Sequence, residues 1–344
     1  MRILLPLLAL FLAAASSAPR YANPVIDHDF PDPAVIRAHD GFFYVYATQS
    51  AGADGKFRNI AAARSRDLVH WSELADALPV KPSWASKTQD YWAPHVIADH
   101  GRYFLYYSAK PDAALTDDKQ GLCLAVATAD GPAGPFTDSG RPLHCGPGFE
   151  NIDPMAFDDP ATGRHLLYWG SGFGPIKVQQ LAPDRLSFAS GSSPRPLLAP
   201  VNSDDTNEYR RLVEGAWVVR HRGYYYLFAS GDNCCGAKAH YGVFVARSRS
   251  ATGPFTIRPR PAYLVVEGDS KWIAPGHNSL ITDRRGRTWM LYHGVAAASP
   301  RTKPGDEVNT RRVMLLDPIE WKNGWPVVRG VHPSSGPHIA PANH

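Results

Sequence analysis

The sequence predicts an all-β protein, a single-domain five-bladed β-propeller, and three observations lead to that prediction. Strongly aromatic runs follow a turn glycine five times along the chain. The segments around them read as short strands, and no segment has a sustained helical period. The glycines are spaced 60, 62, 60 and 63 residues apart, at Gly41, Gly101, Gly163, Gly223 and Gly286. A period held over five copies is the signature of a repeat architecture.

Each repeat contains about four strands. An apolar run precedes the glycine, the aromatic run follows it, and two more segments come after, such as HYGVFVARS and ATGPF after Gly223. These segments are bounded by Gly, Pro, Asp and Ser, as strands usually are. About four strands in ~60 residues are typical of a propeller blade with long loops. Five blades close one ring, so we expect one domain although the chain has 344 residues.

Residues 1–18 read as a secretory signal peptide. A basic start, an apolar run over residues 3–15 and small residues up to Ala18 follow its three-part pattern. The propeller would then span residues 19–344, in a secreted or periplasmic protein. A bilayer span needs ~20 apolar residues, which neither this run nor any later segment provides, so we expect no membrane association.

The charge of the chain argues against nucleic acid as a partner. The formal net charge is +4, and the basic residues are spread along the sequence. Phosphate binding would require a clustered basic stripe. We expect a monomer.

Four cysteines remain in the exported chain, where disulfides are permitted, and they allow three connectivities. A local bridge between Cys123 and Cys145 is one prediction. It would leave the adjacent Cys234 and Cys235, which can close only a small ring and would stiffen the loop after the fourth aromatic run. The alternative is that the adjacent pair are free or separately bridged thiols.

The opening of each repeat predicts the functional site. Nine residues before the glycine stand Asp32, Trp92, Glu214 and His277, and the third copy, with a turn one residue longer, has Asp153 ten before. The first strand of every propeller blade lines the central channel, so these side chains should converge. Three carboxylates in one pocket repel one another, which separates their protonation and is typical of a functional site.

Each of these residues also has a structural interpretation. Asp32 and Asp153 precede prolines and could form turns, Trp92 could be core, and His277 could be a satisfied polar residue. Glu214 lies in an apolar strand, where a carboxylate needs a partner or a purpose. Their coincidence at one repeat position favours a site.

Motifs over essentially the whole mature chain resemble glycoside hydrolase family 43. They are FPDPAVI, YWAPHV, NIDPMAF, VEGAWV, PGHNSLITD and RVMLLDPIEW, in that family's order and spacing. The resemblance implies a five-bladed propeller that hydrolyses glycosidic bonds. It implies Asp32 as general base, Asp153 as the residue that tunes a pKa and positions the substrate, and Glu214 as general acid.

The resemblance also implies roles for two further residues. His277 corresponds to an axial histidine that contacts a channel-bound ion through water, so we expect a structural calcium and no organic cofactor. Calcium prefers oxygen ligands, which makes a direct bond to His277 unexpected. Arg312 corresponds to an arginine that holds sugar hydroxyls, with Arg311 as the competing choice.

An inverting glycosidase needs these residue types on physical grounds. A protonated carboxyl delivers a proton to the leaving oxygen, and an ionised carboxylate activates water across the sugar. We expect a negative Asp153 to raise the pKa of Glu214 while Asp32 stays ionised. The carboxyl groups of Asp32 and Glu214 should lie roughly 6.5 to 9.5 Å apart.

Aromatic faces near this position are expected to stack on sugar rings. The candidates are Trp92, Tyr91, Trp169 and Phe173, although Trp169 ends an aromatic strand and could instead pack between blades.

The resemblance implies a substrate containing arabinose. The chain ends soon after the fifth blade, leaving no room for the β-sandwich of many family xylosidases, and WGSGFGPIKVQQL resembles the arabinanases. We therefore expect an arabinan endo-1,5-α-L-arabinosidase or an α-L-arabinofuranosidase acting on plant polysaccharide or oligosaccharide. A β-xylosidase and a non-catalytic carbohydrate-binding propeller are the alternatives. Endo or exo action depends on loops such as Pro111–Gln120 and Val201–Tyr209, which the sequence does not decide.

Overall fold

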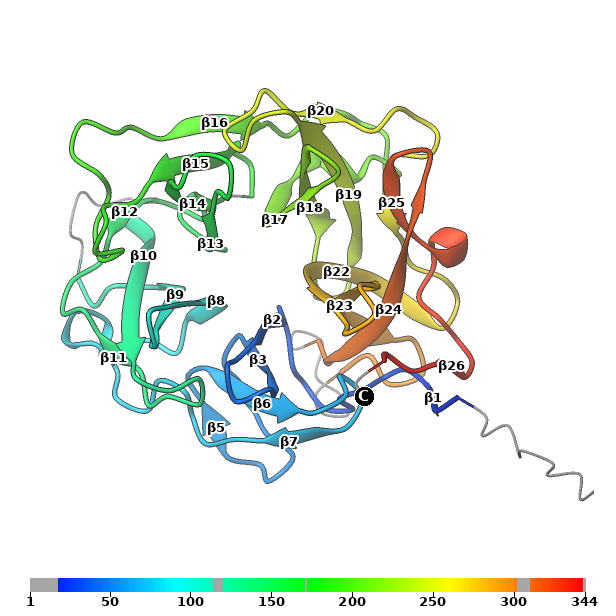
Figure 1. Ribbon diagram of the computed structural model, residues 1–344, viewed down its shortest axis with the longest axis horizontal. Coiled ribbons are helices and arrows are strands. Elements are labelled where there is room, and N and C mark those ends of the chain that lie inside the picture. The colour runs from blue at the N-terminus through cyan, green and yellow to red at the C-terminus, as the bar shows by residue number, and fades with distance from the viewer. Residues whose placement is uncertain (1–17, 114–119, 171, 302–309, 343–344) are drawn as a thin grey trace, which may run out of the picture.

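The computed structural model describes residues 18–113, 120–170, 172–301 and 310–342. Five antiparallel sheets stand around a central opening, as Figure 1 shows. The predicted five-bladed all-β propeller is therefore confirmed. The predicted signal peptide, apart from Ala18, lies outside the described residues.

Each blade runs from a channel-lining strand outward to the rim. Blade I consists of β2 (Ala34–Arg37), β3 (Phe43–Ala47), β6 (Ala61–Ser65) and β7 (Trp71–Glu73). Blade II consists of β8 (Tyr91–Asp99), β9 (Arg102–Ala109), β10 (Gln120–Ala129) and β11 (Thr137–Asp138), with β12 (His144–Pro147) also paired to β10. Blade III consists of β13 (Met155–Asp158), β14 (His165–Trp169), β15 (Ile176–Gln180) and β16 (Arg195–Leu198).

Blades IV and V follow the same order. Blade IV consists of β17 (Val213–His221), β18 (Tyr224–Asn233), β19 (His240–Ser248) and β20 (Thr256–Ile257), with β21 (Leu264–Val266) also paired to β19. Blade V consists of β22 (Trp272–Thr282), β23 (Thr288–Ala296), β24 (Arg312–Lys322) and β25 (Trp325–Val328). The described helices are three 3-10 turns, η1 (Ser83–Ala85), η2 (Tyr209–Arg211) and η3 (Arg329–Val331). A small hairpin, β4 (Ser50–Ala51) with β5 (Phe57–Arg58), extends blade I.

The aromatic runs are the second strands of the blades, and their tyrosines join each blade to the next. Side chains of this strand are buried between blades, where a tyrosine ring needs a partner for its hydroxyl. In four cases the hydroxyl donates to a carbonyl in the turn before the next blade's outermost strand. These bonds are Tyr46 to Pro132, Tyr106 to Arg185 at 2.9 Å, Tyr168 to Ala251 at 2.6 Å and Tyr226 to Gly324 at 2.6 Å.

Blades V and I meet where the two ends of the described chain pair. Strand β1 (Arg20–Tyr21) pairs antiparallel with β26 (His338–Ile339). The hydroxyl of Tyr21 donates to the carbonyl of Leu316 on β24 at 2.7 Å. The amide of Asn23 donates to the same carbonyl and to the Asp317 carboxylate. The N-terminal segment is thus fastened to blade V before it enters blade I.

Both predicted disulfides are present. Cys123 on β10 is joined to Cys145 on β12, and Cys234 is joined to Cys235 in the loop between β18 and β19. No cysteine is free in the described chain, which includes all four. The alternative of free thiols at residues 234 and 235 is therefore wrong.

Candidate active site

In all five blades, one equivalent backbone position in or just before the inner strand has a positive φ. That position holds Asp32 (57°), Ala93 (47°), Asp153 (58°), Gly215 (61°) and His277 (49°). Non-glycine residues rarely adopt this left-handed conformation, so its repetition marks true structural equivalence.

The predicted alignment is therefore one residue out of register in blades II and IV. Trp92 and Glu214 each precede the shared position, occupied there by Ala93 and Gly215. The cause is turn length: β8 and β9 pair as far as Asp99 with Arg102, leaving two residues in the turn, and blade IV is alike. The corresponding turns of blades I and V are longer. Glu214 still enters the pocket because a β-bulge lies between it and Trp217.

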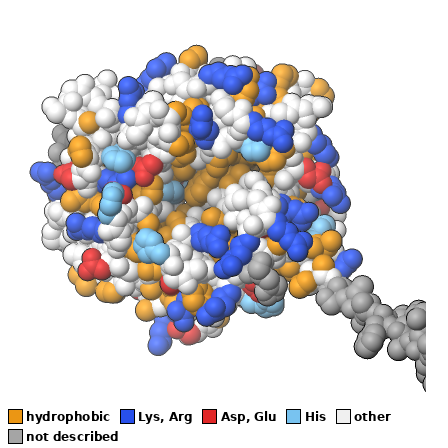
Figure 2. All heavy atoms as spheres, in the orientation of Figure 1, with side chains coloured by type: hydrophobic (Ala, Val, Ile, Leu, Met, Phe, Trp, Pro, Cys, Tyr) orange, Lys and Arg blue, Asp and Glu red, His pale blue; other side chains and the backbone are white. Residues whose placement is uncertain are grey.

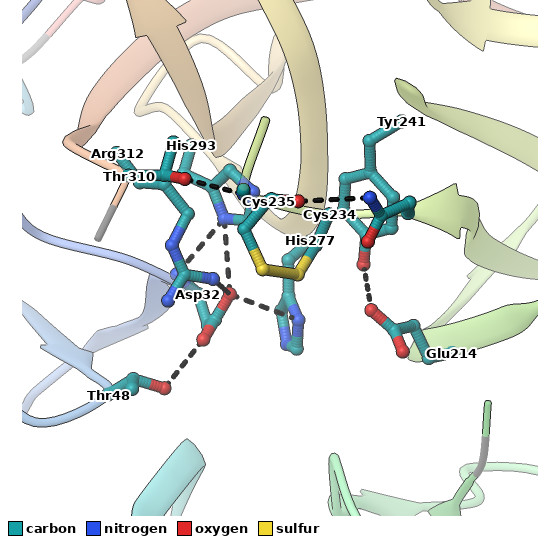
Figure 3. Close-up of a disulfide and its surroundings, with 12 residues drawn as sticks. Asp32, Thr48, Glu214, Cys234, Cys235, Tyr241, His277, His293, Thr310 and Arg312 are labelled. Atoms are coloured by element: carbon teal, nitrogen blue, oxygen red, sulfur yellow. Dashed lines mark hydrogen bonds and ion pairs between the residues drawn. A yellow bond between two sulfur atoms is a disulfide. The ribbon is translucent and has the colours of Figure 1, made fainter. Parts of the chain in front are cut away.

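Asp32 is held by donors on both carboxylate oxygens (Figure 3). Arg312 Nη1 lies 3.0 Å from Oδ1, and Thr48 Oγ1 donates to Oδ2 at 2.6 Å. His293 Nδ1 and His277 Nδ1 lie 3.1 Å and 3.4 Å from Oδ1. Burial alone would raise the pKa of Asp32, but Arg312 and the two histidines outweigh burial and hold it well below its ordinary value. Asp32 is therefore ionised at neutral pH.

Glu214 has the opposite character. The Tyr241 hydroxyl donates a hydrogen bond to Glu214 Oε1 at 2.7 Å. Burial raises the pKa of Glu214 to about 7, and the charge of Asp32 adds to this effect, while the Tyr241 hydrogen bond and Arg312 oppose it. The carboxyl group of Glu214 is thus substantially protonated at neutral pH.

Asp153 lies beside Glu214 and shares its tendency to hold a proton. The Gly215 N–H donates to Asp153 Oδ2 at 2.9 Å. Burial, then the charges of Glu214 and Asp32, raise the pKa of Asp153 well above its ordinary value. This differs from the expectation of an ionised Asp153. Burial leads the shift on Glu214, and the charge that adds to it belongs to Asp32.

Burial disfavours the charged form of both pocket histidines. His277 Nδ1 lies 3.9 Å from Asp153 Oδ2 and contacts Asp32, and burial lowers the pKa of His277. His293 is fully buried, and burial lowers its pKa to about 4. The nearby carboxylate of Asp32 opposes burial at both rings and favours their charged form.

Three residues of the site were not predicted, namely Thr48, His293 and Tyr241. The first two share a sequence signal, because each stands seven residues after its repeat glycine. Ser230, at the same position of blade IV, accepts the His277 N–H at 2.8 Å. The position seven residues after the repeat glycine therefore carries polar side chains of the site in blades I, IV and V, namely Thr48, Ser230 and His293. Tyr241 has no such signal, since it belongs to the third strand of its blade.

The structure separates the two candidate arginines. Arg312 reaches Asp32, and its backbone N–H donates to Asp29 Oδ1 at 2.9 Å. Arg311 turns away to Asp27, at 2.5 Å from Oδ1. Arg312 is therefore the arginine of the pocket.

Two of the four aromatic candidates do not reach the pocket. Tyr91 is completely buried and donates its hydroxyl to the carbonyl of Ala85 at 2.5 Å. Trp169 is 1% exposed and packs on Phe188 with ring centroids 5.6 Å apart. The expectation that Tyr91 and Trp169 stack on sugar rings is wrong, because both side chains are buried and pack against other residues of the protein.

The accessible rings are Trp92 and Phe173, together with Phe149, which the sequence did not indicate. Trp92 is partly exposed and stacks on Phe149, with centroids 5.9 Å apart and planes 12° apart. Phe149 is 53% exposed and Phe173 80% exposed. A Cβ on Gly172 would stand 3.6 Å from Phe149 Cβ, so the Phe173 loop lies against this stack. Figure 2, drawn down the propeller axis, shows a face hollowed at its centre with apolar side chains on the floor.

A family model described as Glycosyl hydrolases family 43 matches residues 21–326. The chain belongs to glycosyl hydrolase family 43. The resemblance inferred from the motifs is thereby confirmed.

Relatives of this glycosyl hydrolase support the same assignment. It is 26% identical over 322 residues to "Extracellular exo-alpha-(1->5)-L-arabinofuranosidase ArbA" of Cellvibrio japonicus, covering 87% of this chain and 86% of that one. It is 29% identical over 329 residues to "Beta-D-galactofuranosidase xynD" of Aspergillus niger, covering 89% and 84%. A solved thermostable family-43 glycoside hydrolase matches with a TM-score of 0.75 and 27% identity, covering 94% of this chain and 99% of that one.

The expected calcium can be tested against the donors of the family 43 pocket. Among the described residues, no group of three or more His, Cys, Asp and Glu side chains could hold a metal. The oxygens of Asp32 are already hydrogen-bonded. Asp153, His277 and Asn278 line a cavity of about 10 Å³, and the buried side-chain amide of Asn278 has no hydrogen-bond partner among the described residues. A directly ligated calcium does not fit there, because calcium takes six to eight oxygens and the cavity admits about one water.

No helix among the described residues is both long enough and apolar enough to cross a bilayer.

Proposed function

We propose that the protein is a secreted inverting glycoside hydrolase that acts on arabinose-containing plant polysaccharide or oligosaccharide, as an arabinan endo-1,5-α-L-arabinosidase or an α-L-arabinofuranosidase. In this proposal Asp32 is the general base, Glu214 the general acid, and Asp153 the neighbouring carboxyl group that positions substrate and accepts the Gly215 N–H next to the acid. The observation that carries it is the opposite protonation of Asp32 and Glu214 at one channel mouth. A pair of carboxyl groups whose pKa values are pushed apart is what acid and base catalysis of glycoside hydrolysis requires.

The reaction follows from these protonation states. Glu214 delivers its proton to the glycosidic oxygen as the bond to the anomeric carbon breaks. Asp32 accepts a proton from the water that attacks the anomeric carbon from the opposite face. The products are a free sugar of inverted configuration and an alcohol, and the proton on Asp32 returns to Glu214 through solvent. Room for the attacking water requires the two carboxyl groups to lie roughly 6.5 to 9.5 Å apart.

The other pocket residues have supporting roles in this scheme. Arg312 and Thr48 keep Asp32 ionised and oriented, as their contacts at 3.0 Å and 2.6 Å allow. Arg312 also has further donors with which to hold sugar hydroxyls. The exposed stack of Trp92 on Phe149 offers a face for a sugar ring.

Arabinose is favoured over xylose by the furanose sugars in the relatives' names. One relative is named an arabinofuranosidase and another a galactofuranosidase. A five-membered sugar ring is the common element. Export is supported by the predicted signal peptide and by the word "extracellular" in the first name.

The test is an activity screen with nitrophenyl α-L-arabinofuranoside, nitrophenyl β-xyloside and linear arabinan, run beside Glu214→Gln. We expect cleavage of the arabinofuranoside, loss of activity in the variant, and an inverted anomer as first product by proton NMR. Cleavage of the xyloside alone would establish the β-xylosidase alternative. Binding of sugars without cleavage of any substrate would establish a carbohydrate-binding propeller.

A further inference from the structure

The disulfide between Cys234 and Cys235 lies at the tip of the β18–β19 hairpin, which is next to β17, the strand that carries the proposed acid. In this hairpin, β18 pairs with β19 as far as Asn233 with His240, and the loop between them holds both cysteines. Glu214 pairs with Ser230 on β18, and Tyr241 on β19 donates to Glu214. The disulfide therefore follows directly on the strands that position Glu214.

The other side of this loop is fastened next to Asp32. The Gly236 N–H donates to the buried Thr310 Oγ1 at 2.6 Å. Thr310 stands two residues before Arg312, which binds Asp32. Within the loop, the Asn233 amide donates to the carbonyls of Cys235 and Lys238, each at 3.0 Å. The loop therefore connects blade IV, which carries Glu214, to the segment of blade V that carries Arg312, the residue that binds Asp32.

The sulfur atoms point into the pocket. In Figure 3 both lie above the space between Asp32 and Glu214, with His277 beneath them. Cys234 and Cys235 are both partly exposed, so a ligand can touch them. The disulfide is consequently a wall of the pocket as well as a brace within the loop.

This wall is chemically suited to the apolar face of a sugar. A disulfide between neighbouring residues fuses two side chains into one small ring, which presents polarizable sulfur and methylene groups and loses little side-chain entropy when a ligand binds. The exposed aromatic rings identified above, Trp92, Phe149 and Phe173, all come from blades II and III. On the side of blades IV and V, the other side chains labelled in Figure 3, such as Glu214, His277 and Arg312, end in polar groups.

We propose that the Cys234–Cys235 disulfide is a sugar-binding surface that packs against the C–H face of the furanose ring held over Asp32 and Glu214. This proposal rests on the proposed function. Dispersion contacts between sulfur and sugar carbons would add affinity, and the fixed position of the ring would exclude sugars whose substituents project toward it. The disulfide is then a determinant of substrate specificity.

The test uses the double variant Cys234→Ala/Cys235→Ala, with Cys123→Ala/Cys145→Ala as the matched control that removes the other disulfide. In the first variant we expect the KM for nitrophenyl α-L-arabinofuranoside and the Ki of arabinose to rise about tenfold, while kcat changes less than about threefold. A higher KM with a nearly unchanged kcat means that the variant has lost binding energy equally in the substrate complex and in the transition state. The control should retain the parental KM and Ki. Unchanged KM and Ki in the first variant would overturn the proposal.

A second variant distinguishes sugar contact from loop bracing. Thr310→Val removes the hydrogen bond that fastens the loop at Gly236 and keeps the disulfide intact. If this variant raises KM as much as loss of the disulfide does, loop position alone explains the effect and the proposal fails. Calorimetric titration of arabinose into Glu214→Gln, with and without the two cysteines, needs no turnover. Loss of binding there supports the sulfur contact even if the proposed hydrolysis is wrong, and equal binding refutes it.

Discussion

Removing the Tyr241 hydroxyl should move the alkaline limit of activity upward. The hydroxyl donates to Glu214 Oε1 at 2.7 Å and opposes the rise of the Glu214 pKa to about 7. A hydrogen bond to a charged group contributes about 1.5 to 3 kcal/mol, and Glu214 is partly exposed, so the lower end applies. Since one pKa unit corresponds to about 1.4 kcal/mol, Tyr241→Phe should raise the pKa of Glu214 by about one unit.

The assay is the pH dependence of kcat/KM on nitrophenyl α-L-arabinofuranoside. The general acid must be protonated, so activity falls as pH rises through the pKa of Glu214, and a higher pKa moves this limb to higher pH. The acid limb reports Asp32 and should stay in place. Phe retains the ring that stacks on His293 at 5.7 Å. Tyr106→Phe is the matched control, because its hydroxyl joins blades II and III away from the carboxylates.

An alkaline limb that stays in place or moves to lower pH in Tyr241→Phe, with the melting temperature preserved, would refute the reasoning. It would mean that Glu214 is not the group whose protonation limits the rate.

Three further predictions concern the base, the packing of the pocket and the ion. Asp32→Asn should lower kcat by roughly 10²- to 10⁴-fold, measured by steady-state kinetics, because the amide cannot accept a proton from water. Gly276→Ala should destabilise the fold by about 1 to 3 kcal/mol in urea unfolding, since its Cβ would stand 2.1 Å from Tyr241 Cδ1, whereas Gly131→Ala has open space. Because a directly ligated calcium does not fit the pocket, removal of ions by chelator should leave Tm and activity unchanged, and a fall in both would show that an ion is bound.

The repeat made the fold predictable, because five evenly spaced glycines mark the same hairpin turn in each blade. Counting back from the glycine placed Trp92 and Glu214 one residue away from the equivalent position. The turns of blades II and IV are shorter than those of blades I and V, and the distance between glycines does not reveal the length of each turn. Glu214 was nevertheless identified, because a carboxylate in an apolar strand is conspicuous by chemistry. Burial of Tyr91 and Trp169 depends on which side of a strand faces the neighbouring blade. A shift of one residue in the strand register moves a side chain to the opposite face of the strand, so the sequence alone did not predict whether these rings are buried or exposed.

Tyr241 shows a different limit of sequence reasoning. Its ring lies in a space left by Gly276 on the neighbouring blade, and its hydroxyl reaches Glu214 across its own sheet. No periodicity links these three residues, so only the folded arrangement reveals them.

The left-handed backbone conformation shared by residues 32, 93, 153, 215 and 277 costs stability at positions that carry pocket side chains. A non-glycine residue held in this conformation costs about 1 kcal/mol, and four of the five positions hold one. At Asp32, Asp153 and His277 that cost cannot be avoided, because glycine would remove the side chain the pocket uses. Ala93 has no such duty, so Ala93→Gly should raise Tm by roughly 1 to 2 °C in calorimetry with kcat unchanged. Ala93 is therefore a position of this set where stability can be gained, because its side chain is not used by the pocket.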